Sequence, residues 1–373
     1  DKMINWIKSN IEGDRIIWII AIVLSVISLL SVYSATGSLA YQKMGGNTEY
    51  YLIKHFILIL LSFIAMWFSH RIDYKYYSKI ALIGLYASIP LLIITYKFGL
   101  NINEASRWIN IPIINQAFQP SDLAKLSLII YLSSFLAKRQ NELDDIKTLI
   151  IPFLWIGFIC LFIALTNLST ALILGATSML LMFISRVQIK HLSILIVFIL
   201  FCGILALITG QRGKTALTRA ENFINKKDIP FQLEQAYIAV STGGLFGKGP
   251  GNSNQKNFLP QSYSDFIYAI IIEEYGFLMG ISIIVLYLVL LLRGLKIFIK
   301  SERPFGGLLS AGLSFALVIQ AMINMCVVVG LLPVTGVTLP LISMGRTSQL
   351  FTGITLGIIL SVSRKNKVEE SYV

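Results

Sequence analysis

The feature that most constrains this chain is a repeated pattern of long apolar runs with almost no charge. Ten runs can be drawn, over residues 16–35, 54–69, 79–97, 120–137, 147–166, 170–185, 191–209, 265–292, 306–331 and 344–362. A helix needs about 20 mostly apolar residues to cross the hydrocarbon of a bilayer. The strands of a membrane barrel would instead show about 10 residues of alternating polarity. The sequence therefore predicts an all-α, polytopic membrane protein with ten transmembrane helices in a single domain over residues 1–373.

The distribution of basic residues predicts the orientation of these helices. If the N-terminus is cytoplasmic, the inner segments carry 18 of the 31 Lys and Arg residues, and the short outer loops carry five. Loops on the cytoplasmic side are enriched in Lys and Arg. We therefore expect a multi-pass protein of the cytoplasmic (inner) membrane with both termini in the cytoplasm.

One long hydrophilic stretch, residues 210–264, lies between the seventh and eighth runs and is expected outside the membrane. Loops of this length in a compact protein are usually functional. Its basic residues outnumber its acidic ones, seven to three: Arg212, Lys214, Arg219, Lys226, Lys227, Lys248 and Lys256 against Glu221, Asp228 and Glu234. Two interpretations are open, namely general attraction to anionic lipid headgroups and a binding site for a phosphate-bearing substrate.

Within that stretch, three basic residues are the better candidates for binding phosphate. Arg212 and Arg219 carry guanidinium groups, which bind phosphate through two parallel hydrogen bonds, whereas lysine acts as a point charge. Lys248 lies in a glycine-rich run over residues 243–251, where backbone amides could assist. A series of tight turns is the alternative interpretation of that run.

Charged side chains inside an apolar run are costly and therefore suggest function. Asp122 and Lys125 stand three residues apart in the fourth run, just after Pro120, which suits a first helical position. They could form a self-neutralising ion pair that shapes the helix bundle, or the polar floor of a cavity that opens outward. Arg107, in the preceding outer loop, could cap the same cavity.

Acidic residues also mark the point where the long loop re-enters the membrane. Asp265, next to Ser264, could cap the eighth helix or act as a general base at the outer rim. Glu273 and Glu274 follow in the same helix. Adjacent helical residues point about 100° apart, so at least one of the two should face the bundle, either as a hydrogen-bonded structural carboxylate or as a substrate contact.

Three blocks of sequence together resemble the SEDS family of membrane proteins, the FtsW/RodA/SpoVE group. They are Arg107-Trp108-Ile109 with Gln119–Lys125; Gly243–Gly249 with Leu259-Pro260, Ser264–Ala269 and Glu273–Gly276; and Asn324 with Leu332–Gly336, Leu339-Pro340 and Ile342–Gly345. The blocks occur in the family's order. The chain departs from the family's pattern at Asp122, usually Glu, at Met344, usually Tyr, and at Arg346, usually Gly. A further family block is reduced to Thr166–Thr170, and we assign it no role.

The resemblance implies a peptidoglycan glycosyltransferase that polymerises lipid II at the outer membrane face. The family's essential acidic residue corresponds to Asp265. The stretch Leu341–Gly345 is more similar to the division branch of the family than to the elongation branch (RodA). The implied partners are a class B penicillin-binding protein, which is a transpeptidase, and other division proteins.

The expected chemistry is a single displacement with inversion at the anomeric carbon. The base takes the proton of a sugar hydroxyl, and cations offset the charge on the leaving diphosphate. These cations would come from the loop or from a bound Mg²⁺ or Mn²⁺, although the Cys and His residues show no metal-ligand spacing.

The alternative is a flippase for the same lipid-linked precursor, in which Asp122, Lys125 and Glu273 would line a path. The candidate site comprises Asp265 as catalytic base and the substrate-binding residues Arg107, Asp122, Lys125, Arg212, Arg219, Lys248, Ser264 and Glu273.

Overall fold

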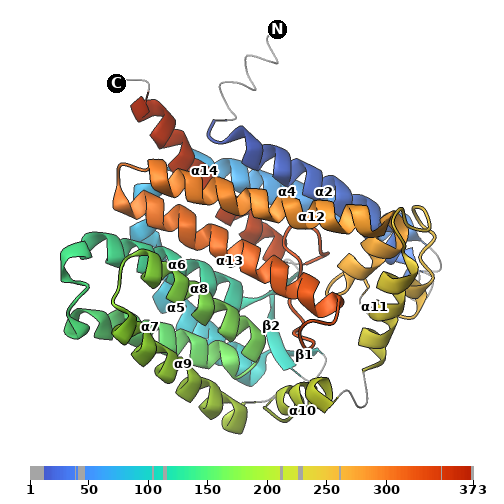
Figure 1. Cartoon of the computed structure of the whole chain (residues 1–373), viewed down its shortest axis with the longest axis horizontal. Coiled ribbons are helices and arrows are strands. Elements are labelled where there is room, and N and C mark those ends of the chain that lie inside the picture. Colours follow the sequence, from blue (N-terminus) through green and yellow to red (C-terminus); the bar gives the residue numbers. More distant parts are fainter. Residues whose placement is uncertain are drawn as a thin grey trace.

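Ten long helices form the body of the protein in a computed structural model that describes residues 12–37, 39–40, 47–102, 105–111, 116–210, 213–225, 230–259, 262–345 and 347–370. They are α2 (Arg15–Ala35), α4 (Thr48–Arg71), α5 (Tyr77–Phe98), α6 (Pro120–Lys138), α7 (Ile146–Ala164), α8 (Leu168–Ile184), α9 (Ile189–Thr209), α12 (Ile267–Lys300), α13 (Pro304–Val328) and α14 (Ser348–Glu370). Each overlaps one predicted apolar run, so the all-α prediction is confirmed. Figure 1 shows that α2 begins and α14 ends at the same end of the bundle.

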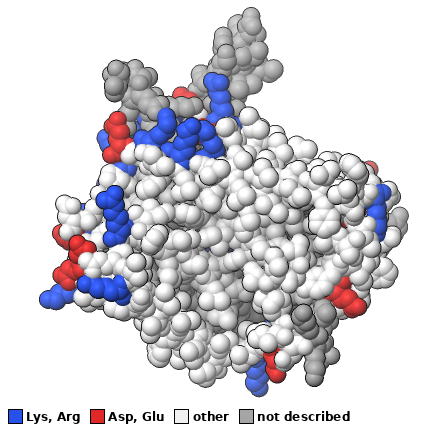
Figure 2. Space-filling model, in the orientation of Figure 1, with Lys and Arg blue, Asp and Glu red and all other residues white. Residues whose placement is uncertain are grey.

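Most of these helices suit a lipid bilayer. By length and composition, seven in the described part of the chain could span one: α2, α4, α5, α7, α9, α12 and α13. Of the other three, α8 has only 17 residues, α6 contains the charged pair Asp122 and Lys125, and α14 ends in charged residues. In Figure 2 the broad middle of the visible face carries few charged side chains, as expected for a surface against hydrocarbon.

The centre of the bundle is α13, which packs against α12, α6, α8 and α14. Small residues allow these close contacts, which is the usual way that helices associate in membranes. A Cβ atom on Gly294 of α12 would lie 1.9 Å from Ser314 Oγ of α13, so only glycine fits there. In contrast, α5 and α9 expose large apolar side chains such as Ile83 (72% exposed) and Val197 (67%), which suit contact with lipid tails.

A small antiparallel sheet precedes α6, and the sequence did not predict it. It consists of β1 (Leu100–Ile102), β2 (Ala105–Ile111) and β3 (Gln116–Phe118), with β2 in the middle. Trp108 is paired with Leu100, and Ile109 with Phe118. Strands as short as three residues carry almost no periodic signal, which explains why the sequence pattern missed them.

In its described residues, the predicted outer loop over 210–264 contains two helices and one short 3₁₀ turn. They are α10 (Gly213–Asn225), α11 (Phe231–Thr242) and η3 (Gln255–Asn257). Figure 1 shows α10 and α11 at the end of the bundle away from the start of α2, beside the sheet. The loop is therefore a folded cap over one end of the helices.

The glycine-rich run of this cap pairs with a break in α12. Gly276 interrupts the helix with φ 79° and ψ 177°, a conformation that favours glycine. The carbonyl oxygens of Glu273 and Glu274 then accept hydrogen bonds from the amides of Lys248 and Gly249, both at 2.9 Å, and the Phe277 amide donates to the Gly244 carbonyl at 2.9 Å. Residues 244–249 thus satisfy backbone groups that the broken helix leaves unpaired.

Candidate active site

Asp265 lies at the end of the bundle that carries α10 and α11, two residues before α12 begins. Its carboxylate accepts a hydrogen bond from Ser264 Oγ at 3.1 Å, and its side chain is half-buried. The alternative role as a helix cap is wrong, because Phe266 occupies the N-cap position and no side-chain hydrogen bond caps the helix there. The Asp265 side chain is therefore not committed to the end of α12.

The backbone around Asp265 is fixed by residues from the C-terminal third of the chain. Asn324 Nδ2 donates to the Asp265 carbonyl at 2.9 Å and to the Val337 carbonyl at 2.7 Å. Ser343 Oγ donates to the Ser264 carbonyl at 2.7 Å. From sequence, Asn324 and Ser343 were only part of a family resemblance. In the structure they hold the backbone that carries the Asp265 carboxylate.

Arg219, on α10, is the basic residue of the cap that the structure brings to Asp265. Its Nη1 donates to the Val334 carbonyl at 3.3 Å. Burial lowers the pKa of the Arg219 guanidinium, and attraction to the Asp265 carboxylate opposes that shift. A guanidinium stays protonated in proteins, so a cation and a carboxylate interact at this end of the bundle.

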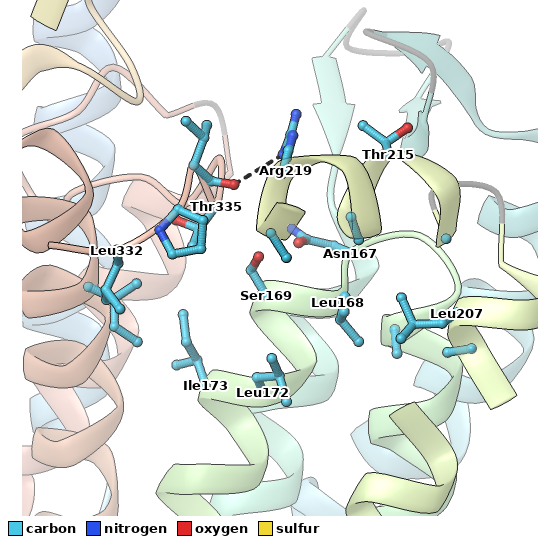
Figure 3. A pocket seen from close by; sticks show the side chains of 18 of the residues that line it. Asn167, Leu168, Ser169, Leu172, Ile173, Leu207, Thr215, Arg219, Leu332 and Thr335 are labelled. Carbon is cyan, nitrogen blue, oxygen red and sulfur yellow. Dashed lines mark hydrogen bonds between the residues drawn. The ribbon is translucent and has the colours of Figure 1, made fainter. Parts of the chain in front are cut away.

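An apolar cavity of about 450 Å³ lies beneath Arg219. We call it the α8–α9 cavity; its lining comes from α7 to α10, α13 and the segment 332–335 that follows α13. Figure 3 shows Arg219 and Thr215 at its upper edge, with Leu168, Leu172 and Leu207 below. A long hydrocarbon chain fits such a lining, while the cation at the edge suits an anionic head group.

Polar residues at the mouth of this cavity were not identified as a site from sequence. Asn167, from the block to which the sequence gave no role, caps α8 through a hydrogen bond from the Thr170 amide to Asn167 Oδ1 at 3.4 Å. It lines the cavity together with Ser169 and Thr335. The N-cap position immediately before an apolar run was the available signal in the sequence.

The predicted ion pair between Asp122 and Lys125 is present in α6. Lys125 Nζ lies 2.8 Å from Asp122 Oδ1, and the two side chains are 20% and 5% exposed. Asp122 Oδ2 is buried and has no hydrogen-bond partner among the described residues. The pair borders a separate small cavity of about 60 Å³ that also contains Gln320 and Thr352.

Glu273 forms a second ion pair, with Lys248. The distance between Lys248 Nζ and Glu273 Oε1 is 2.6 Å, and the Glu273 side chain is 0% exposed. Its carboxylate also accepts hydrogen bonds from Ser253 Oγ and from the amides of Asn254 and Gln255. The Lys248 ammonium group therefore neutralises a buried carboxylate, and its contact with phosphate stays a prediction.

Two predicted site residues, Arg107 and Arg212, lie partly or wholly outside the described residues. Arg107 falls in β2, next to the sheet pair of Trp108, and its side chain lies outside the described residues; Arg212 lies outside them altogether. Glu274, like Glu273, is fully buried, so the sequence prediction that at least one of the two faces inward is confirmed. The cap covers the face of α12 that would otherwise expose one of them.

Comparison with known proteins identifies the chain's relatives. The family model for cell cycle proteins of the FtsW, RodA and SpoVE type matches residues 14–368. A probable peptidoglycan glycosyltransferase FtsW of Geobacter metallireducens is 33% identical, with 95% of each chain covered. Stage V sporulation protein E of Bacillus subtilis is 32% identical over 95% of this chain and 98% of its own.

Solved structures show the same fold at lower sequence identity. The rod shape determining protein RodA of Thermus thermophilus superposes with a TM-score of 0.69 at 22% identity, over 95% of this chain and 97% of RodA. A chain of a peptidoglycan synthase complex, studied for the coordination of polymerization and crosslinking, gives 0.68 at 23% identity over 91% of this chain and 96% of its own. Together with the match over almost the whole sequence, these likenesses confirm that this chain is a member of the FtsW/RodA/SpoVE family of cell cycle proteins.

Proposed function

We propose that this protein is a peptidoglycan glycosyltransferase that polymerises lipid II, in agreement with the names of its full-length relatives. The observation that carries the proposal is the position of Asp265. It is a half-buried carboxylate with its backbone fixed, and it attracts the Arg219 guanidinium, which lines the α8–α9 cavity. These features supply a base, a cation for the diphosphate and an apolar space for the lipid chain.

The reaction joins two sugars by one displacement. Asp265 takes the proton of the acceptor's 4-hydroxyl while the oxygen of that hydroxyl attacks the anomeric carbon of the donor. The bond from that carbon to the diphosphate breaks, and its electron pair leaves with the polyprenyl diphosphate. Arg219 is placed to stabilise this developing negative charge, and attack opposite to the leaving group inverts the anomeric centre.

A divalent cation, Mg²⁺ or Mn²⁺, is part of this proposal. Among the described residues, no group of three His, Cys, Asp or Glu side chains could hold a metal ion. Asp265 and Ser264 would offer one carboxylate and one hydroxyl. Mg²⁺ is commonly bound by one or two carboxylates together with substrate phosphates and water, so these residues fit such an ion when the diphosphate supplies its remaining ligands.

The structure supports a transferase more than a flippase. A flippase needs a path that passes a disaccharide head group through the membrane depth. The cavity at Asp122 and Lys125 holds about 60 Å³, whereas ligand sites typically measure about 300–1,000 Å³. Glu273, the third residue of the proposed path, is fully enclosed by Lys248 and its other donors.

The setting of the reaction is proposed from charge and from the relatives. Figure 2 shows Lys and Arg side chains gathered near the start of α2 and the end of α14, as expected for the cytoplasmic side. We place both termini in the cytoplasm and Asp265 at the outer face of the cytoplasmic (inner) membrane. Relatives named FtsW favour a role in cell division, with a class B penicillin-binding protein and other division proteins as partners.

Polymerisation of purified lipid II by the reconstituted full chain tests the function. We expect glycan strands from the wild-type protein, alone or with a class B penicillin-binding protein. The control is Asp265→Asn with the same partner, since the partner could carry a contaminating polymerase. Absence of polymer under both conditions, with a folded protein, would reject the transferase.

A further inference from the structure

A second apolar cavity lies on the other side of Arg219. It measures about 540 Å³ and is formed by α10, α11 and the end of α13, so we call it the α11–α13 cavity. Its lining includes Phe223, Ile224, Leu233, Tyr237 and Val329. It is therefore similar in size and in apolar character to the α8–α9 cavity.

The two cavities share one wall. Arg219, Pro333 and Val334 line both of them. The hydrogen bond from Arg219 Nη1 to the Val334 carbonyl closes this wall, and the Asp265 carboxylate attracts the same guanidinium. Two apolar spaces thus meet at one cation, which a nearby carboxylate attracts.

The rim of the α11–α13 cavity exposes large apolar side chains. Among its lining residues, Ile224 is 76% exposed, Val329 40% and Phe223 36%. A patch of this kind is unfavourable in water and marks contact with lipid or with another protein. On a protein of the membrane, at the level where its helices end, lipid hydrocarbon is the contact that this chemistry favours.

The chemistry of the reaction requires room for two such chains. This step rests on the proposed function, in which lipid II is joined to a second molecule that carries its own polyprenyl diphosphate. The α8–α9 cavity offers space for one chain. We propose that the α11–α13 cavity binds the polyprenyl chain of the second substrate, so that both head groups meet at Arg219 and Asp265. Arg219 then separates the two chains and faces both diphosphates.

The competing possibility is that a single lipid chain runs through one cavity and continues into the other. The two arrangements differ in the number of chains that the protein binds. Native mass spectrometry of the full chain in neutral detergent, titrated with a long-chain polyprenyl diphosphate, counts them. A neutral polyprenol of the same length serves as the control for non-specific association.

Bulky substitutions assign each bound chain to a cavity. Val329→Trp fills the α11–α13 cavity, and its matched control Leu331→Trp lies two residues away, lines neither cavity and is exposed. Ala216→Trp fills the α8–α9 cavity, and its matched control is Leu217→Trp on the same helix. We expect two bound equivalents for the wild type and both controls, and one for each cavity variant, with polymerisation at least tenfold slower in the cavity variants.

The equivalent that a cavity variant retains shows that the variant is folded. Saturation of the wild type at one equivalent would overturn the proposal, as would two equivalents in Val329→Trp or the loss of both. Failure of the proposed function looks different. A wild type that binds two equivalents but makes no polymer from lipid II would keep the two-chain site and reject the transferase.

Discussion

Glu273 and Asp265 lie eight residues apart and are held in opposite ways. The Glu273 carboxylate is 0% exposed and is surrounded by Lys248, Ser253 and two backbone amides. Asp265 is half-buried, accepts a side-chain hydrogen bond from its neighbour Ser264, and attracts the cation of Arg219. Its backbone and that of Ser264 are held by hydrogen bonds from Asn324 and Ser343.

This difference separates a structural carboxylate from one that can react. A buried carboxylate that is paired and hydrogen-bonded on several sides is costly to disturb. A half-buried carboxylate that lies near a cation and whose backbone is fixed can accept a proton from substrate. The contrast predicts that changes at Asp265 affect rate without stability, whereas changes at Glu273 affect stability first.

The largest effect on rate is expected for Asp265→Asn. The amide keeps the size of the side chain and removes the base, so lipid II polymerisation should fall about 10²- to 10⁴-fold, the usual contribution of a general base. The melting temperature in detergent should not change. Ser264→Ala serves as the control for loss of the neighbouring hydrogen bond and should keep most of the activity. Polymer at a near wild-type rate from Asp265→Asn would remove Asp265 from the mechanism.

Glu273→Ala tests the other half of the comparison. It leaves the Lys248 ammonium without its carboxylate, a cost of roughly 3–5 kcal/mol for a buried pair. We expect a clear drop in melting temperature and in the yield of folded protein. Glu273→Ala/Lys248→Ala should recover part of that loss, since no uncompensated charge is left. A Glu273→Ala protein of normal melting temperature but low activity would instead place Glu273 in the reaction.

The Asp122–Lys125 pair extends the comparison to α6, where one carboxylate oxygen is already unpartnered among the described residues. Lys125→Ala should reduce stability or activity more than Asp122→Ala/Lys125→Ala does, because the single change leaves a buried anion. A coupling of about 0.5–3 kcal/mol is expected from melting curves of the four proteins. Strictly additive losses would show that the two side chains act independently.

Arg219→Ala should reduce activity less than Asp265→Asn does. Hydrogen bonds to charged groups contribute about 1.5–3 kcal/mol, so the lipid II requirement should rise roughly tenfold or more. The titration is done in neutral detergent, where attraction to anionic lipid is absent. Lys214→Ala, an exposed basic residue on the same helix, is the matched control and should have little effect. Equal, small losses at both positions would contradict a specific phosphate contact.

Much of the fold could be predicted from the sequence because hydropathy alone marks helices that cross a membrane. The run over 191–209, for example, became α9 (Ile189–Thr209). The structure of the outer cap could not be predicted in this way. Amphipathic α10 sits in a polar stretch with many basic residues, and the sequence reads it as a loop. The apolar face of α10 lines cavities that other helices help to form, so its role cannot be recognised from α10 alone.

The candidate site was predictable where charge breaks an apolar run, as at Asp122 and Lys125. It was less predictable where partners are distant in sequence. Lys248 and Glu273 are separated by a turn-rich segment, so spacing gives no sign that they meet. Asn324 and Ser343 position Asp265 from far along the chain through backbone carbonyls, and a carbonyl carries no sequence signal.

The break at Gly276 sets an order for biosynthesis. Each backbone group left unpaired in hydrocarbon costs several kcal/mol, and the carbonyls of Glu273 and Glu274 and the amide of Phe277 find partners in residues 244–249. That segment is synthesised before α12. Helix α12 therefore enters the bilayer stably only together with the glycine-rich segment, and the two constitute one unit of membrane insertion.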